Sequence, residues 1–276
     1  MNSGHSDEGK VFVCPFCDWR NTVRRLLDGA GLAKRLVGCR TVLIKPNLVE
    51  ARKPPVTTPV NLVAALLEYL REEAPTARLI VAEGNGAVDY ATNSCFDALG
   101  YSALAADGIE LLDLNTAPLT ELARADCSRW PTMHLPRILF ESFLISVPVL
   151  KAHTLAGVTL TMKNMMGVAP PAHYRQGGHW KKAAFHAEIQ EAVLDLNRYR
   201  TPDFTVLDAT FGMQEAHLWG PTCEPPPNRL AAGYDPVAID AYGSGLLGRD
   251  WRKIGHISRA AGKLGTADPL RIVELG

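Results

Sequence analysis

Side chains that can carry charge or exchange a proton follow one apolar run of the chain. Residues 145–150 lead directly into Lys151, His153 and Thr154, and Lys163 comes nine residues after Thr154. In open α/β sheets, ligands bind outside the carboxyl ends of the strands, where helix N-termini also point free N–H groups. A histidine near its neutral pKa suits proton transfer, and lysines suit negative charge that accumulates on an oxygen. We therefore take Lys151, His153 and Lys163 as candidate catalytic residues.

Other polar residues accompany further apolar runs. Lys45 lies in the run at residues 41–46, Asn47 follows it, and Asp208 ends the run at residues 204–208. A cation beside a buried strand end needs a partner or a ligand, and parallel strands would bring such residues to one edge of a sheet. We therefore expect the substrate to contact Lys45, Asn47, Thr57, Thr58, Thr154, Asn164, His179 and Asp208.

Some of these residues also have a structural interpretation. Thr58 and Thr154 are of a type that caps helices or stabilises turns, and Thr58 stands directly before Pro59 and a helical pattern. The segment Gly84-Asn-Gly86 resembles part of a phosphate-binding turn, but the chain contains neither G-x-G-x-x-G nor G-x-x-x-x-G-K-(S/T). A looser anion site, made of helix N-terminal amides and lysines, suits a carboxylate or a phosphate.

A segment at residues 167–186 is dense in Gly, Pro, His and cations, as lids and binding loops often are. Its His173, His179 and His186 could bind a metal together with His153, but their spacing matches no established short zinc motif. We therefore assign no metal ligands. The cofactor stays unknown, with a divalent metal as an open alternative.

Composition and charge limit the classes of partner. The 276 residues are 47% hydrophobic, and 29 Lys plus Arg balance 29 Asp plus Glu, so the overall charge does not favour nucleic acid. We expect no membrane contact, because no apolar stretch reaches spanning length and residues 1–10 lack signal-peptide features. Cys14 and Cys17 form a lone C-x-x-C pair, so reduced thiols are expected. The chain is expected to be cytoplasmic, with a homo-oligomer left open.

The apolar patterns predict a βαβ unit. Residues 41–46 are typical of a strand, residues 59–71 have apolar positions at helical spacing, and residues 79–83 are typical of a second strand. A strand that is followed by a helix and another strand predicts parallel pairing.

The same order of patterns recurs later in the chain, at residues 143–149 and at residues 204–208, the latter before a helix from about Pro236. We therefore expect an α/β fold in which a layered, mostly parallel sheet is flanked by helices. A single domain is expected over residues 1–276, with its core at about residues 40–266.

Several separated motifs together carry a family resemblance. They are Lys45-Pro-Asn-Leu48, Thr57-Thr58-Pro59, Lys151-Ala-His-Thr154 with Val158-Thr-Leu-Thr-Met-Lys-Asn164, and the segment from Ala231 to Asp240. In this order they resemble the DUF362 family, an uncharacterised α/β family, from about Lys45 to Gly265. Some members carry ferredoxin-type cysteine clusters; this chain has none, so the resemblance implies no iron–sulfur cluster here.

The sequence departs from the family pattern in one segment, and it has one further, more distant similarity. The family's usual segment with Glu-Gly and Gly-Pro is present only as Gln214-Glu-Ala216 and Gly220-Pro221. The layout is also distantly similar to the N-terminal domain of nickel-dependent lactate racemases, in which Lys and His flank a small hydroxy acid. That likeness is an analogy of fold and does not transfer a reaction.

The leading hypothesis is an enzyme that acts on a small anionic metabolite. Lys151 and Lys45 would hold a carboxylate or phosphate, His153 would exchange a proton, and Lys163 would be the alternative base or a second anion contact. The reaction could be isomerisation, elimination or group transfer.

Two other classes of function stay open. The chain could bind a metal or metallocofactor, or it could be a non-catalytic interaction module of a biosynthetic pathway. In the second case the lysines would merely pair with Asp208, Glu215 or Asp240.

Overall fold

The computed structural model describes residues 7–276. Residues 1–6, part of the segment analysed for signal-peptide features, lie outside the described residues. The strands are β1 (Lys10–Pro15), β2 (Thr41–Pro46), β3 (Arg78–Glu83), β4 (Glu110–Asp113), β5 (Leu119–Ala123), β6 (Thr132–Pro136), β7 (Phe143–Val147), β8 (Val149–His153), β9 (Gly157–Thr159), β10 (Phe204–Met213), β11 (Arg229–Gly233) and β12 (Arg271–Glu274).

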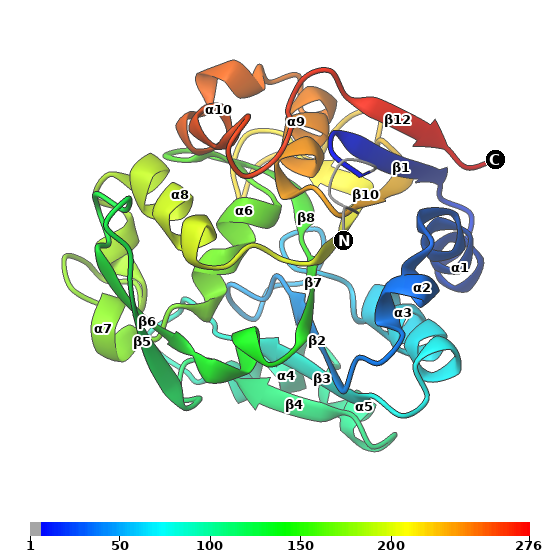
Figure 1. Ribbon diagram of the computed structural model, residues 1–276, viewed down its shortest axis with the longest axis horizontal. Helices are drawn as coiled ribbons and strands as arrows, with labels where there is room; N and C mark the ends of the chain where they lie inside the picture. The colour runs from blue at the N-terminus through cyan, green and yellow to red at the C-terminus, as the bar shows by residue number, and fades with distance from the viewer. Residues whose placement is uncertain (1–6) are drawn as a thin grey trace.

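Helices connect several of these strands (Figure 1). They are α1 (Trp19–Ala30), α2 (Leu32–Leu36), α3 (Val60–Glu73), α4 (Thr92–Ala98), α5 (Ser102–Ala105), α6 (Thr161–Asn164), α7 (Pro171–Tyr174), α8 (Ile189–Tyr199), α9 (Pro236–Leu246) and α10 (Gly255–Ala260). Single 3₁₀ turns cover Arg137–Phe140, Met165–Val168, Ala183–Phe185 and Trp251–Lys253.

One large mixed sheet organises the molecule. Its strands follow the order β12-β1-β11-β10-β7-β2-β3-β4, while β8 pairs with β10 and β9; β5 and β6 form a separate two-stranded sheet. The strands β10, β7, β2, β3 and β4 pair parallel to one another, and β11 is antiparallel to both of its neighbours. The prediction of a mostly parallel sheet flanked by helices is therefore confirmed.

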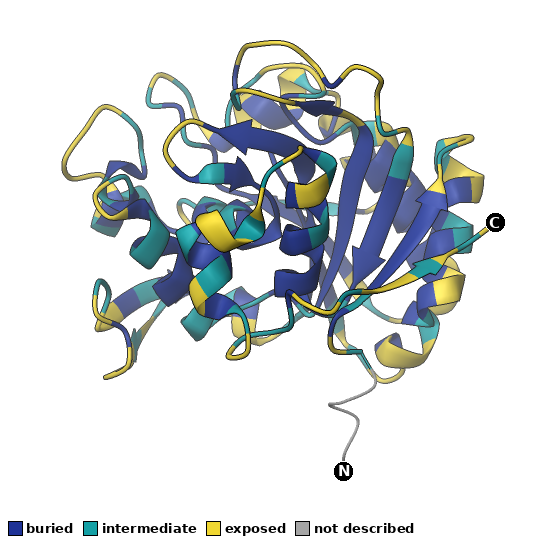
Figure 2. Ribbon diagram, turned by 90° about the horizontal axis from the view of Figure 1, so that it is seen from above, coloured by how far each residue is buried: buried dark blue, intermediate teal, exposed yellow. Residues whose placement is uncertain are grey.

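The side chains of the central strands point alternately to the two faces of the sheet, so that a hydrophobic layer forms on each face. On β2, Val42 and Ile44 face a core shared with α1 and α3, whereas Leu43 faces a core shared with α8, α9 and α10. Successive strand residues point to opposite faces, so a strand that is apolar throughout must be covered on both sides. Figure 2 shows the strands as buried ribbons between partly exposed helices.

The predicted βαβ unit is present, with one local difference. Strands β2 and β3 pair in parallel through Thr41↔Arg78 to Ile44↔Val81, and α3 connects them. The expected N-cap at Thr58 is wrong, because α3 starts one residue later, with Pro59 at the cap position. The Thr58 hydroxyl instead donates a hydrogen bond to the Val147 carbonyl (2.6 Å).

The later elements include strands that the sequence analysis did not predict. The run at residues 143–149 continues as β7 and then β8, and the β8–β9 hairpin precedes the expected helix, α6. Asp235 caps α9, since its side chain accepts from the N–H groups of Val237 and Ala238. The sheet also runs past residues 40–266, because β1 and β12 pair at its edge.

No helix within residues 7–276 is long and apolar enough to cross a membrane.

Leu66 tests the packing of α3 against the sheet. Its side chain is fully buried in the core on that face. We expect Leu66→Ala to lower the free energy of unfolding by about 2–5 kcal/mol through lost transfer energy and a residual cavity. Asn61→Ala, at an exposed position of the same helix, should change it by about 0.5 kcal/mol or less. Urea denaturation measures both, and equal stabilities would contradict the packing.

Candidate active site

A cavity of about 390 Å³ opens at the carboxyl edge of the parallel strands. Asn47 follows β2, Glu83 ends β3, His153 ends β8 and His217 follows β10, so the chain order brings all four side chains to one place. The cations of the lining are Lys151, Lys163 and Lys182. The remaining lining residues include His186, Thr154, Thr159 and Asn164, and the apolar Val49, Leu155, Met166, Trp180, Leu218 and Trp219.

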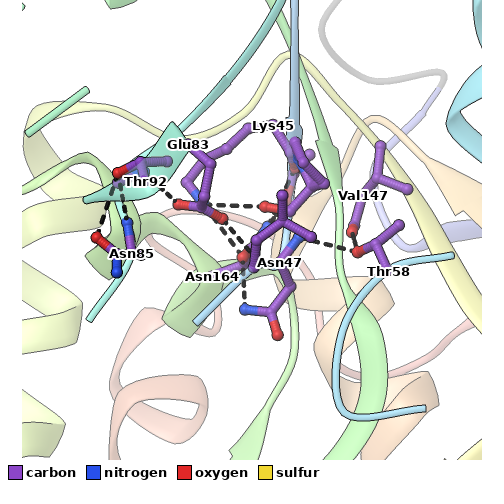
Figure 3. A network of polar contacts seen from close by, with 12 residues as sticks. Lys45, Asn47, Thr58, Glu83, Asn85, Thr92, Val147 and Asn164 are labelled. Carbon is purple, nitrogen blue, oxygen red and sulfur yellow. Dashed lines mark hydrogen bonds and ion pairs between the residues drawn. The ribbon is translucent and has the colours of Figure 1, made fainter. Parts of the chain in front are cut away.

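A fully buried lysine, Lys45, contacts two residues of the cavity lining, Glu83 and Asn164. Lys45 donates to both carboxylate oxygens of Glu83, at 2.9 and 3.0 Å, and to the Asn164 side-chain oxygen at 3.2 Å (Figure 3). Glu83 also accepts from the backbone N–H groups of Leu48 and Gly84. Burial lowers the pKa of the Lys45 amine and the Glu83 carboxylate opposes that shift. Each of these two charges is therefore compensated inside the protein.

Two amides connect this ion pair to Lys151. The Asn164 side-chain oxygen accepts from the Asn47 amide (3.0 Å), and the Asn47 oxygen accepts from the Lys151 amine (2.6 Å). Lys151 also donates to the Val56 carbonyl at 2.6 Å. Burial, with Lys163 as the next cause, lowers the pKa of Lys151 to about 7. Near neutral pH this amine can therefore gain or lose a proton.

Close packing behind the ion pair requires glycine. A Cβ atom at Gly167 would lie 2.0 Å from a Glu83 carboxylate oxygen and 2.6 Å from the Lys45 amine. A Cβ atom at Gly84 would lie 2.4 Å from the Gly167 carbonyl oxygen. The segment after α6 can thus pass directly over the ends of β2 and β3 only because these positions lack side chains.

Lys163 differs from the other cavity lysines. It lies on α6, a short helix whose first N–H groups, those of Thr161 and Met162, donate to Asp240 on α9 at 2.7 and 3.1 Å. Within residues 7–276 the half-buried Lys163 amine has no hydrogen-bond partner. Burial lowers its pKa to about 8. The fold therefore holds a titratable, unpaired amine in the cavity wall.

The β8–β9 hairpin fixes the state of His153. Its Nδ1 atom accepts from the backbone N–H groups of Leu155 and Ala156, both at 3.1 Å, so the proton of the neutral ring is on Nε2. Burial, with Lys163 as the next cause, lowers the pKa of His153 well below its ordinary value. His217 stacks on this ring at 4.0 Å. His153 is thus a neutral N–H donor.

The segment at residues 167–186 supplies another part of the cavity wall. Lys182 is buried and donates to the Asn115 side-chain oxygen (2.6 Å) and to the Ala169 carbonyl. Burial lowers the pKa of Lys182 to about 7. Trp180 and His186 also line the cavity. The segment expected to be a binding loop thus contributes to the cavity wall, and it contains α7 and 3₁₀ turns. Its role in binding stays a prediction.

Some predicted contact residues lie outside the cavity lining. Asp208 is inside β10, because that strand continues to Met213, and its carboxylate accepts from Thr210. Thr57 donates to the Arg52 carbonyl, and His179 is exposed. Lys45 lies behind Glu83. The structure thus brings together Lys151, His153, Lys163, Asn47, Asn164 and Thr154 at the cavity, but not Thr57, Thr58, His179 or Asp208.

Lys182 and His217 are among the cavity side chains that the sequence-based list of contacts lacks. Lys182 could have been inferred from its place in the cation-rich segment at residues 167–186. His217 has no such signal, because it becomes part of the site only when β10 extends beyond Asp208 and the following loop folds over His153.

The four histidines suggested as metal ligands do not form one cluster among the described residues. Within residues 7–276, no group of three or more His, Cys, Asp or Glu side chains is arranged to hold a metal ion. His173 stacks on His134 at 3.9 Å, whereas His153 and His186 line the cavity. Cys14 is buried and Cys17 is exposed, and both are free thiols.

The fold and the site define a single-domain α/β protein with a lysine-rich cavity at the carboxyl edge of its sheet. The family model described as "Domain of unknown function (DUF362)" matches residues 42–245, and the chain therefore belongs to the DUF362 family. No protein with a curated description matches the sequence.

A solved structure also shares the fold. The lactate racemase apoprotein from Thermoanaerobacterium thermosaccharolyticum aligns with a TM-score of 0.52 and 12% sequence identity. The alignment covers 88% of this chain but only 57% of the racemase, so this chain spans little more than half of that protein. At this identity the likeness concerns the fold alone.

The buried ion pair should dominate local stability. We expect Lys45→Met to lower the free energy of unfolding by about 3–5 kcal/mol, because it leaves the Glu83 charge buried and unpaired. Adding Glu83→Gln should recover part of this loss, since the remaining amide is uncharged. Urea denaturation of the single and double variants, with the exposed Lys34→Met as a control, measures the effect. A Lys45→Met protein as stable as the wild type would contradict the interpretation.

Proposed function

We propose that this protein is an enzyme that binds a small anionic metabolite, a carboxylate or a phosphate, in the cavity and transfers a proton to or from it. The observation that carries the proposal is the charge of the lining. The lining contains three lysines, Lys151, Lys163 and Lys182, but only one carboxylate, that of Glu83. This carboxylate is already paired with Lys45. The cavity therefore has more cationic groups than anionic ones, and an anion would supply the missing charge.

Binding would use the hydrogen-bonding capacity that the protein leaves free. Lys151 donates two of its three N–H bonds to protein oxygens, which leaves one for a ligand, and Lys163 has all of its capacity available. The His153 Nε2–H group would donate to a second oxygen of the ligand. An anion held by these groups would be oriented against Lys163.

Lys163 is the group best suited to move the proton. Its pKa of about 8 leaves a substantial neutral fraction near neutral pH, and its amine has no competing acceptor. His153 would act as a neutral donor that stabilises negative charge on oxygen, since its Nδ1 atom is engaged by backbone N–H groups. This differs from the expectation that His153 exchanges the proton.

The apolar part of the lining would keep bulk water from the reacting groups. Leu218 is buried, while Trp180 and Trp219 lie at positions where a bound molecule would cover them further. Electrostatic interactions strengthen when water is excluded from a site. The racemase that shares the fold acts, by its name, on lactate, a small carboxylate, which agrees with this ligand class.

The interaction-module alternative receives less support. It would have the lysines pair with Asp208, Glu215 or Asp240, but Asp208 accepts from Thr210 and Asp240 accepts from the start of α6. Binding of a metal in the cavity likewise lacks a cluster of ligands among the residues that the structure describes.

The lysine pKa values give a pH dependence with a defined sign. An anion favours the charged amines, so it raises the pKa values of Lys151 and Lys163 from about 7 and about 8 in the free protein. Binding should therefore take up protons, and affinity should fall as the pH rises through and above this range. Isothermal titration calorimetry with oxalate, in buffers of different ionisation enthalpy, measures the uptake. Affinity that increases with pH would contradict the proposal.

Lys163→Met separates binding from folding. We expect this variant to lose at least tenfold in oxalate affinity, because the unpaired cation disappears from the cavity. Its melting temperature should stay the same or rise, since no hydrogen bond is lost and a buried ionisable group is removed. Lys34→Met, at an exposed position, should leave both quantities unchanged. Unaltered oxalate binding in Lys163→Met would exclude this role.

A further inference from the structure

The lysines around the cavity differ in what their amines contact. Four of them donate to oxygen atoms of the protein, namely Lys45, Lys151, Lys181 and Lys182. Lys163 alone among these five has no acceptor within residues 7–276, although it lines the same cavity. The N–H bonds of a lysine that donates to two or three protein acceptors are already engaged by the protein. An amine without acceptors can present a lone pair instead.

Burial shifts Lys163 toward its neutral form. Burial lowers its pKa to about 8, and Lys163 and Lys151 are close enough for Lys163 to lower the pKa of Lys151. A desolvated lysine beside a second cationic group is the arrangement in which an amine becomes a nucleophile toward a carbonyl carbon.

Two further polar atoms in the cavity lack partners. The hydroxyl of Thr159 is buried and has no hydrogen-bond partner in the described structure, and the same holds for the Nδ1 atom of His217. Both residues line the cavity together with Lys163. Since buried polar groups are nearly always paired, these atoms mark positions where a ligand oxygen or hydroxyl would complete the hydrogen bonding.

We propose that Lys163 forms an imine with the aldehyde or ketone group of a small anionic substrate, such as a 2-oxo acid. This inference rests on the proposed function and narrows its substrate class. The Lys163 nitrogen would attack the carbonyl carbon while the carbonyl π electrons move to oxygen. A proton then passes from nitrogen to that oxygen, which gives a carbinolamine, and loss of water with a further proton gives the protonated imine.

The neighbouring groups match the needs of each step. The His153 Nε2–H and the Thr159 hydroxyl can donate to the oxygen as it gains charge, and the Lys151 ammonium can supply the proton for departing water. The protonated imine withdraws electrons from the adjacent carbon, so a C–H or C–C bond there can break. Hydrolysis returns the free amine, and the sequence of steps requires no oxidant or reductant.

Reductive trapping tests the imine directly. Pyruvate is added with sodium cyanoborohydride, and the protein is measured by intact mass spectrometry and by peptide mapping. We expect one stable adduct per chain, located on Lys163, in the wild type and in the exposed-position control Lys34→Arg. Lys163→Arg, which keeps the charge but not the nucleophile, should give no such adduct while it still binds oxalate.

The outcomes separate the two proposals. If the wild type binds oxalate but pyruvate is not trapped, or is trapped equally in Lys163→Arg, the imine is excluded and the anion site stands. Adducts spread over surface lysines would also exclude it. If neither oxalate nor pyruvate binds at all, the proposed function fails and the imine fails with it.

Discussion

A buried ion pair between Lys45 and Glu83 ties together the ends of two adjacent parallel strands. The Glu83 carboxylate also accepts from the backbone that leaves each strand, at Leu48 and at Gly84. Lys45 in turn contacts Asn164, from which hydrogen bonds extend through Asn47 to Lys151. A buried charge is tolerated only with a partner, so Lys45 and Glu83 must stay in contact. The residues hydrogen-bonded to them, Leu48, Gly84 and Asn164, are thereby held in place.

The lysines that line the cavity above this ion pair lower the stability of the protein as well as supplying reactive groups. Lys151, Lys163 and Lys182 are all desolvated, and burial lowers the pKa of each. Such groups reduce stability, because folding favours their neutral forms while the unfolded chain holds them charged near neutral pH. The apolar layers on both faces of the sheet must offset that cost. Perturbed titratable groups gathered in one cleft are what a functional site requires.

Much of this architecture could be predicted from sequence, because local apolar patterns determine it. Strand β2, helix α3 and strand β3 follow simple periodicity, and the parallel edge places Lys151 and His153 beside Asn47. The β8–β9 hairpin, the length of β10 and the position of His217 depend on tertiary pairing that no local pattern encodes. Thr58 does not cap α3 because its hydroxyl oxygen accepts from the backbone N–H of Asn47, while the hydroxyl donates to the Val147 carbonyl.

Native mass spectrometry of gently purified protein, with parallel elemental analysis, tests the central claim most directly. If the cavity is an anion site, the wild type should carry a small anionic molecule at up to one per chain, or acquire one when oxalate is added, and Lys163→Met should lose it. No anion bound under either condition would contradict the account, and a stoichiometric transition metal found in its place would favour the metal-binding alternative.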